Sequence, residues 1–385
     1  MTTILGLEVL LESRLDLVAG KRVGLVACPS SVDRHLRSSV ELLHQHPDIN
    51  LVALFGPEHG IRGDAQAGAK VDSTVDPLTQ LPVHSLYGKT QRPSPDTLRD
   101  LDLIIIDLQD AGVRFYTFVA TALYVMQAAR EADTSVVILD RPAPINGNQV
   151  EGPMLETAYS SFVGPAPLPI RYGLTIGELA RLRNEQDIHC DLTVVPLRNW
   201  SREMWYDQTG LPFVPSSPNL PTLDAMTLYP GTCLIEGANL SEGRGTTRPF
   251  EYIGAPWIKA ESLAAELNAL DLAGARFRPV YFVPSFGKYQ GELCAGAHVY
   301  VSDREQFQPV SALLRVLQTL KRSHPDSFQW RKPWLPGRQR PIDLLWGSDR
   351  LRRQIDAGRP VEELAARWQP GLQQFKELSG DYMLY

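Results

Sequence analysis

Short, continuous runs of apolar residues alternate with longer amphipathic segments from Lys21 to about Leu197, and this alternation restricts the possible folds more than any other feature. The runs predict strands at 23–27, 51–55, 101–107, 135–140 and 192–197. Their continuity is typical of parallel strands that are covered on both faces. Helical spacing predicts helices at 38–46, 117–132 and 175–186, the last beginning with a capping box of Thr175 and Glu178. We therefore expect an α/β fold, a Rossmann-like parallel sheet with helices on both faces.

The composition of the chain changes after Trp200, where prolines become frequent and a glycine-rich segment follows at 231–245. We therefore divide the 385 residues into a Rossmann-like domain at 1–215 and a smaller C-terminal α+β domain at 216–385, with a cleft between them. In the second domain the pattern predicts strands at 277–286 and 297–303 and helices at 309–323, 343–357 and 361–377.

Charge and composition exclude several classes of function. The formal net charge of -6 comes without any basic stripe, so we expect no nucleic-acid partner. No apolar stretch is long enough to cross a membrane, and the N-terminus has no basic leader. We therefore expect a cytoplasmic protein, or a periplasmic one if the start codon is misassigned. Nothing in the sequence indicates the oligomeric state.

Metal and cofactor signatures are also missing from the sequence. The four cysteines, at 28, 190, 233 and 294, are widely spaced, so we expect buried free thiols and no metal site. Gly56, Gly60 and Gly63 do not form the dinucleotide-binding pattern, so no cofactor is predicted.

The chemically rich segments follow predicted strands, where ligands bind in open parallel sheets. The first is the loop Gly-Pro-Glu-His-Gly at 56–60, in which glycines and a proline fix the backbone around Glu58 and His59. A general acid would suit this place, although the loop could also be a turn whose side chains satisfy local backbone groups.

Two further strand ends carry charged residues. After 101–107, Asp110, Arg114 and Tyr116 offer a carboxylate, a guanidinium and a ring on which a sugar could stack, although Arg114 could instead pair with an aspartate. After 135–140, Asp140 and Arg141 are interpreted as a structural ion pair.

Another segment, 235–247, alternates polar residues with glycines at the expected domain border. It contains Glu236, Asn239, Glu242 and Arg244, which is more than a plain turn needs. Carboxylates on the loops of two lobes, with arginines and aromatics nearby, suit glycoside hydrolysis. No Gly-x-Ser-x-Gly elbow is present, which weighs against an α/β-hydrolase.

Several strings then resemble one family in the same order: LFGPEHGIRG (54–63), IIDLQDAGVRFYTF (105–118), ILDRPAPING (138–147), RYGLTIGELA (171–180), SPNLP (217–221) and YPGTCLIEGANLSEGRGT (229–246). They resemble the NamZ/YbbC family of exo-acting β-N-acetylmuramidases, and the match runs from about Val23 to the end of the chain. The resemblance implies a bacterial glycosidase of cell-wall recycling that releases N-acetylmuramic acid (MurNAc) from the non-reducing end of peptidoglycan fragments, such as muropeptides and the disaccharide MurNAc-GlcNAc. It also implies a catalytic role for Glu58.

The resemblance allows roles to be assigned as hypotheses. Glu58 is the predicted general acid, His59 tunes or orients it, and Glu242 or Asp110 is the second carboxylate, unless the substrate's own acetamido group replaces it. A lactyl carboxylate needs a cation, for which the candidates are Arg114, Arg171 and Arg244. The predicted substrate-binding set also contains Tyr116, Asn219, Glu236 and Asn239. Competing hypotheses are a non-catalytic muropeptide-binding protein and a lyase that acts on MurNAc.

Overall fold

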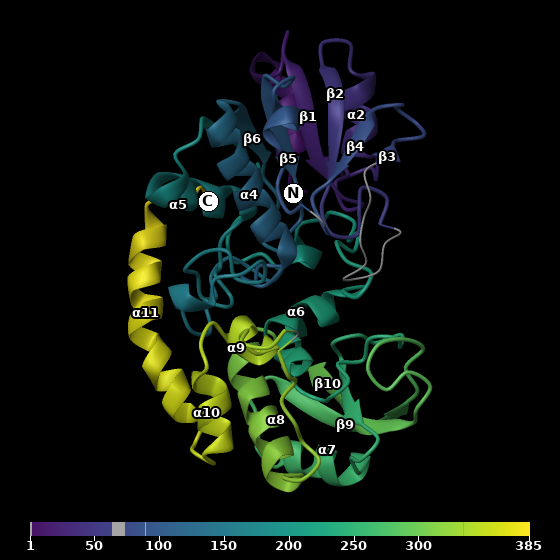
Figure 1. Ribbon diagram of the computed structural model, residues 1–385, viewed down its shortest axis with the longest axis vertical. Helices are drawn as coiled ribbons and strands as arrows, with labels where there is room; N and C mark the ends of the chain where they lie inside the picture. The colour runs from purple at the N-terminus through teal and green to yellow at the C-terminus, as the bar shows by residue number, and fades with distance from the viewer. Residues whose placement is uncertain (1, 64–73, 89, 334) are drawn as a thin grey trace.

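The computed structural model describes residues 2–63, 74–88, 90–333 and 335–385 (Figure 1). Within these residues, seven strands form one sheet in the order β3-β4-β2-β1-β5-β6-β7. The strands are β1 (Arg22–Ala27), β2 (Asn50–Gly56), β3 (Thr74–Val75), β4 (Pro82–Ser85), β5 (Leu103–Asp107), β6 (Ser135–Leu139) and β7 (Leu192–Val195). All neighbouring strands are parallel except β3 and β4.

The order of the parallel strands is that of a Rossmann fold, so the predicted fold class is confirmed. The chain moves outward from β1 through β2 to β4, then returns to the other side of β1 and continues through β5, β6 and β7. The direction reverses between β1 and β5, and the crevice beyond the carboxyl ends of the strands at such a point is where ligands bind in this class of fold.

Both faces of the sheet are buried, which explains why the predicted strands are continuously apolar. In β5, Ile104 and Ile106 belong to the core that includes α4, whereas Leu103 and Ile105 face a second core that includes α1 and α2. The helices of this domain are α1 (Gly6–Ser13), α2 (Ser39–Gln45), α3 (Pro95–Leu98), α4 (Thr117–Ala132) and α5 (Ile176–Arg183).

The predicted capping box at the start of α5 is confirmed. The Thr175 hydroxyl accepts a hydrogen bond from the Glu178 backbone N–H at 3.2 Å, and the Glu178 carboxylate accepts one from the Thr175 N–H at 3.0 Å. The regular α-helix ends at Arg183, and the predicted end at 186 falls in a π-helical turn, Asn184–Ile188.

The second part of the chain forms a smaller α+β domain, as predicted, and its sheet is antiparallel. Its strands lie in the order β8-β10-β9. They are β8 (Tyr252–Ala255), β9 (Ala275–Phe282) and β10 (Cys294–Val301), and its helices include α6 (Leu223–Thr232), α7 (Ala260–Asn268) and α8 (Pro309–Ser323). The strand predicted at 277–286 ends at Phe282, shortly before Pro284, which has no N–H to donate.

The helix predicted at 343–357 is instead two helices, α9 (Pro341–Trp346) and α10 (Arg350–Asp356). Gly347 separates them because its φ of 88° is incompatible with a continuous right-handed helix. The chain then enters α11 (Glu362–Gly380), which runs from the smaller domain back to the Rossmann-like domain and ends beside α5 (Figure 1).

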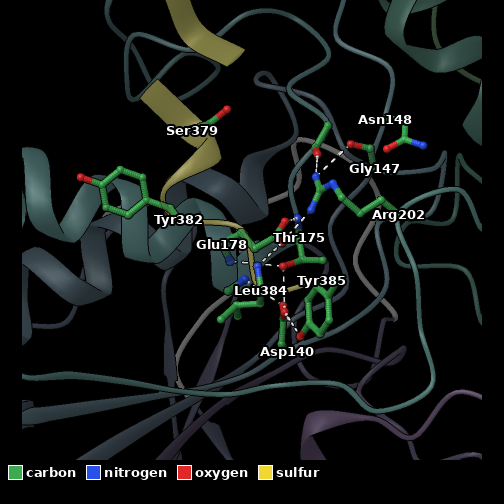
Figure 2. A network of polar contacts seen from close by, with 12 residues as sticks. Asp140, Gly147, Asn148, Thr175, Glu178, Arg202, Ser379, Tyr382, Leu384 and Tyr385 are labelled. Atoms are coloured by element: carbon green, nitrogen blue, oxygen red, sulfur yellow. Dashed lines mark hydrogen bonds and ion pairs between the residues drawn. The ribbon is translucent and has the colours of Figure 1, made fainter. Parts of the chain in front are cut away.

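The segment after α11 is anchored to the Rossmann-like domain through buried polar groups (Figure 2). The Tyr385 hydroxyl donates to the Asp140 carboxylate at 2.7 Å and accepts from the Leu197 N–H at 2.7 Å. The Leu384 N–H donates to the Glu178 carboxylate at 2.8 Å. The C-terminal segment therefore joins the two domains a second time.

The predicted ion pair between the neighbouring residues Asp140 and Arg141 is wrong. Successive residues of an extended chain point in opposite directions, so the two side chains diverge at the end of β6. The Arg141 guanidinium binds the carboxylate of Asp107 at 2.6 Å, on the adjacent strand β5. Asp140 instead accepts hydrogen bonds from the Thr175 hydroxyl and the Gly177 N–H.

The cysteine prediction is confirmed, because all four thiols are buried and free. None of the helices in the described part of the chain is long and apolar enough to span a membrane.

Candidate active site

The Gly-Pro-Glu-His-Gly loop follows β2 and turns sharply away from the sheet. The Gly60 N–H donates to the Pro57 carbonyl at 2.9 Å, and both His59 and Gly60 have a φ of 73°. A left-handed backbone costs a residue other than glycine about 1–3 kcal/mol, and such strain is concentrated at functional sites. Glu58 and His59 are nonetheless 9% and 4% exposed, so the turn holds two ionisable side chains largely out of water.

Two hydroxyl groups hold the Glu58 carboxylate. The Thr117 hydroxyl, at the first residue of α4, donates to Glu58 Oε2 at 2.7 Å. The Tyr87 hydroxyl, which follows β4, also forms a hydrogen bond with Glu58. Burial and then the charge of Glu58 raise the pKa of Tyr87, so Tyr87 keeps its proton and acts as a donor.

Glu58 lies in a small pocket of about 50 Å³ to which both parts of the chain contribute. The pocket is lined by Glu58, His59, Phe115, Tyr116, Thr117, Ser217, Leu220, Tyr229, Arg244 and Phe250. Its aromatic rings pack edge to face, with centroids 5.4 Å apart for Phe115 and Tyr229 and 4.8 Å apart for Tyr229 and Phe250. This packing gives the pocket an aromatic wall in which the rings fix one another's orientation.

Arg244 brings positive charge to the pocket. Its guanidinium lies 3.0 Å from the carboxylate of Glu236, 3.2 Å from that of Glu242 and 5.1 Å from the centre of the Phe250 ring. Burial alone would lower the pKa of Arg244, but the two glutamates raise it, so the guanidinium is permanently charged.

The two glutamates that flank Arg244 differ in accessibility. Glu242 has 5% of its side chain exposed and also pairs with Lys288 Nζ at 2.9 Å. Burial would raise the pKa of Glu242, but Lys288 and Arg244 outweigh that effect and lower it. Glu236 has 28% of its side chain exposed. Glu236 does not line the pocket itself and is connected to it through its ion pair with Arg244.

The structure does not bring Asp110 to this pocket. Asp110 is 1% exposed and accepts hydrogen bonds from the Tyr172 hydroxyl and, at 3.1 Å, from the Gly112 N–H. Burial raises its pKa to about 6. These contacts are those of a carboxylate that holds the loop after β5 in place.

Two of the three predicted arginines also lie elsewhere. Arg114 is completely buried, and its guanidinium donates to four backbone carbonyls, those of Pro153, Leu168, Leu345 and Trp346. Arg171 donates to the Ile145 carbonyl and to the Gln149 side chain and lines a different cavity. Burial lowers the pKa of Arg114 to about 9 and that of Arg171 to about 10.

The remaining predicted residues are divided between the pocket and the scaffold. Tyr116 lines the pocket and donates its hydroxyl hydrogen to Ser216 at 2.7 Å. Asn219 lines an adjoining cavity. Asn239 lies in the scaffold, where its amide bonds Ser327 and Gln329, both at 2.8 Å.

Sequence reasoning missed several residues of the site. Thr117 follows a predicted strand end, so the same rule that selected Asp110 could have selected it. Tyr87 follows β4, whose four residues include Pro82 and His84 and give no apolar run. Lys288 donates to the carbonyls of Ile235, Ala238 and Leu240 besides pairing with Glu242, and no local pattern indicates this role.

The ionisable side chains at the pocket suit acid–base chemistry, in which a proton is transferred to a bond whose atoms carry no charge. Among the described residues, no three His, Cys, Asp or Glu side chains group in a way that could hold a metal ion. The pocket is lined by the ionisable groups Glu58, His59 and Arg244, and Arg244 in turn pairs with Glu236 and Glu242.

Comparisons with known proteins identify the family of the chain. Residues 23–224 match the model described as exo-β-N-acetylmuramidase NamZ, N-terminal, and residues 227–385 match its C-terminal counterpart. The chain is 47% identical over 381 residues to the peptidoglycan β-N-acetylmuramidase NamZ of Bacillus subtilis strain 168, covering 99% of this chain and 91% of that protein.

Two solved structures of DUF1343 family proteins from Bacteroides fragilis NCTC 9343 are also similar. One is 37% identical with a TM-score of 0.91, and the other is 31% identical with a TM-score of 0.77. Each comparison covers 100% of this chain and 99% of the other.

Proposed function

Because this chain belongs to the NamZ family of exo-β-N-acetylmuramidases, we propose that its Glu58 pocket releases MurNAc from the non-reducing end of fragments such as MurNAc-GlcNAc. The protein is a glycoside hydrolase that acts on peptidoglycan-derived substrates. The observation that carries the assignment to this pocket is the Glu58 carboxylate, held by Thr117 and Tyr87 beyond the carboxyl end of β2.

In this proposal Glu58 is the general acid. The leaving oxygen of a glycoside must receive a proton as its bond to the anomeric carbon breaks. The Thr117 hydroxyl binds Glu58 Oε2 and so fixes the orientation of the carboxyl group that delivers the proton. As the carboxylate forms, the hydrogen bonds from Thr117 and Tyr87 stabilise its charge without any rearrangement.

We assign the second carboxylate to Glu236 in preference to Glu242 or Asp110. Glu242 is enclosed between two cations, and Asp110 is 1% exposed and bonded to Tyr172 and Gly112, whereas Glu236 is partly exposed and, among the described residues, has one charged partner, the pocket residue Arg244. A carboxylate in this position can activate water or orient the substrate's acetamido group, and both roles stabilise an oxocarbenium-like transition state.

Arg244 is the proposed partner of the lactyl carboxylate of MurNAc. It lines the pocket beside Glu58, and 20% of its side chain is exposed. A guanidinium can bind a carboxylate through two parallel hydrogen bonds. The substrate's carboxylate would share Arg244 with Glu236, which couples recognition of MurNAc to the position of the second carboxylate.

Glu58→Gln tests the acid. It should lower kcat on MurNAc-GlcNAc about 10²- to 10⁴-fold while the melting temperature changes little. On an aryl MurNAc glycoside, whose leaving group needs little protonation, the kcat of the variant should fall much less. Equal, small losses on both substrates would remove Glu58 from the mechanism.

Arg244→Ala tests recognition of the lactyl group. The ratio of kcat/KM for an aryl MurNAc glycoside to that for the matching GlcNAc glycoside should fall about ten- to a hundredfold, the value of a charge-assisted hydrogen bond. The matched control is Arg248→Ala, because Arg248 lies in the same loop but pairs with Glu251. Equal losses on both glycosides would contradict the role of Arg244.

A further inference from the structure

Four charged side chains of alternating sign form a row that includes the pocket residue Arg244. Glu236 lies 3.0 Å from Arg244, Arg244 lies 3.2 Å from Glu242, and Glu242 lies 2.9 Å from Lys288 Nζ. Of the four, Arg244 lines the pocket. We call these four side chains the charge row, with Glu236 at one end and Lys288 at the other.

Lys288 joins the charge row from a different loop and is held at a fixed position. It lies between β9 and β10, whereas the other three residues belong to the segment 235–247. Its ammonium donates to three backbone carbonyls of that segment, those of Ile235 at 3.3 Å, Ala238 at 3.2 Å and Leu240 at 2.5 Å. An ammonium has three N–H donors, and because the backbone engages them the charge of Lys288 stays beside Glu242.

Glu242 needs a cation other than Arg244. Its side chain is 5% exposed, so water can do little to stabilise its charge. Burial acts to raise the pKa of Glu242, and of the two cations that lower it Lys288 has the larger effect. If Lys288 were neutral, Arg244 would be the one cation left beside Glu242 among the described residues, and two carboxylates would share its guanidinium before any ligand arrived.

The charge balance of the row changes in the same direction. With Lys288 present, two cations offset two carboxylates, and the row is neutral. Without Lys288 the row carries one net negative charge. An anionic group that approaches Arg244 would then meet repulsion from Glu236 and Glu242, and juxtaposed like charges weaken binding.

We propose that Lys288 is a positioning residue for substrate recognition: by neutralising Glu242, it leaves the Arg244 guanidinium available to a carboxylate on the sugar in the Glu58 pocket. Lys288 acts through Glu242 and Arg244 and not by contact with the substrate. The inference rests on the proposed function, because it takes the lactyl carboxylate of MurNAc as the ligand of Arg244.

The test separates the charge of Lys288 from its role as an anchor of the loop. Lys288→Met removes the ammonium and keeps the apolar stem. Lys288→Met combined with Glu242→Gln removes both charges, so the row is neutral again although the anchor is still absent. Tyr289→Phe is the matched control, because the Tyr289 hydroxyl donates to the Asn239 carbonyl at 2.6 Å and is an uncharged anchor of the same loop.

The assay measures kcat and KM of the full-length enzyme on an aryl MurNAc glycoside and on the matching GlcNAc glycoside, which has no lactyl carboxylate. Lys288→Met should raise the KM of the MurNAc glycoside about tenfold, the value of a charge-assisted hydrogen bond, and should leave its kcat nearly unchanged. The KM of the GlcNAc glycoside should stay close to that of the wild type. The double variant should recover most of the lost affinity, and Tyr289→Phe should keep the wild-type ratio of the two KM values.

The double variant also guards against a failure to fold. Lys288→Met leaves the buried carboxylate of Glu242 with one charged partner fewer, and such a loss is destabilising. The double variant has no such carboxylate. If Lys288→Met does not fold, the double variant alone decides: a KM near that of the wild type supports the proposal, and a KM raised tenfold or so contradicts it.

Three results would overturn the proposal: an unchanged KM for the MurNAc glycoside in Lys288→Met, a double variant as impaired as the single one, or the same rise in KM in Tyr289→Phe. Failure of the proposed function gives different results. The wild type would then not hydrolyse the MurNAc glycoside, or Arg244→Ala would lose equal activity on both glycosides.

Discussion

Tyr385 offers a direct measure of how strongly α11 fastens the smaller domain to the Rossmann-like domain. Its hydroxyl makes two partly buried hydrogen bonds, one to the Asp140 carboxylate (Figure 2) and one from the Leu197 N–H, each at 2.7 Å. Its ring packs edge to face on Trp200, with centroids 5.0 Å apart. Tyr385→Phe removes only the hydroxyl and keeps the ring contact.

The size of the effect follows from the partners. A hydrogen bond to a charged group contributes about 1.5–3 kcal/mol and a neutral one about 0.5–1.5 kcal/mol. Together they predict that Tyr385→Phe lowers the free energy of unfolding by about 2–4 kcal/mol at pH 8. The pH matters because burial raises the pKa of Asp140 to about 7, so the carboxylate is ionised at pH 8 and protonated at pH 5.

The sign of the pH dependence is therefore defined. A carboxyl group with a raised folded-state pKa contributes stability that is complete below its unfolded-state pKa and is lost as the pH rises through the folded value. The Tyr385 hydrogen bond lowers the pKa of Asp140, so its removal raises that pKa further. The destabilisation by Tyr385→Phe should accordingly grow between pH 5 and pH 8.

Urea titration followed by circular dichroism and by tryptophan fluorescence measures this difference, provided that both probes give one transition. Tyr382→Phe is the matched control, because no hydrogen bond of the Tyr382 hydroxyl occurs in the described part of the chain and Figure 2 shows that hydroxyl directed away from Asp140. The reasoning fails if the two variants lose the same stability, or if the loss in Tyr385→Phe is the same at both pH values.

Three further outcomes are expected. Burial raises the pKa of Asp110 to about 6, so the free energy of unfolding of the wild type should fall by about 3 kcal/mol between pH 4 and pH 7 through this group, and Asp110→Asn should not show this fall. Unfolding curves of both proteins at each pH measure the effect, and a difference between them that does not vary with pH would contradict it. Arg114→Lys should lower the free energy of unfolding by more than about 3 kcal/mol, because a lysine cannot reach all four carbonyls. Thermal melts at one pH measure this loss, and a melting temperature within about 2 °C of the wild type would refute the prediction. Gly296→Ala should disrupt the pairing of β10 with β8, because a Cβ at this position would lie 1.9 Å from the Ile253 carbonyl oxygen. Gly380→Ala should be neutral or slightly stabilising, because a Cβ there would meet no atom within 4 Å. Similar melting temperatures for the two variants would contradict this account.

The Rossmann-like domain could be predicted because its strands are buried on both faces and therefore stand out as continuous apolar runs. The runs that became β1, β2, β5, β6 and β7 lie within one or two residues of the predicted bounds. β3 and β4 escaped prediction because they lie at the edge of the sheet and are short and partly polar. The break at Gly347 depends on a backbone angle, which hydrophobic periodicity does not reveal.

The site could be predicted in part, for a related reason. Glu58, His59 and Tyr116 follow strands whose ends meet at one edge of the sheet, and all three line the pocket. Arg114 follows the same kind of strand end, yet its partners are carbonyls up to 232 positions away along the chain. A guanidinium that binds a ligand and one that binds the backbone look alike in sequence, because only the fold shows where carbonyls converge.

The position of Arg114 also bears on how the chain is made. Two of the carbonyls that it binds, those of Leu345 and Trp346, are synthesised long after β5 and α4. Until the smaller domain has been synthesised, Arg114 has only the carbonyls of Pro153 and Leu168 to bind, and an incompletely paired guanidinium is costly to bury. We therefore expect the packing around Arg114 to be completed only when the region around residue 346 emerges from the ribosome.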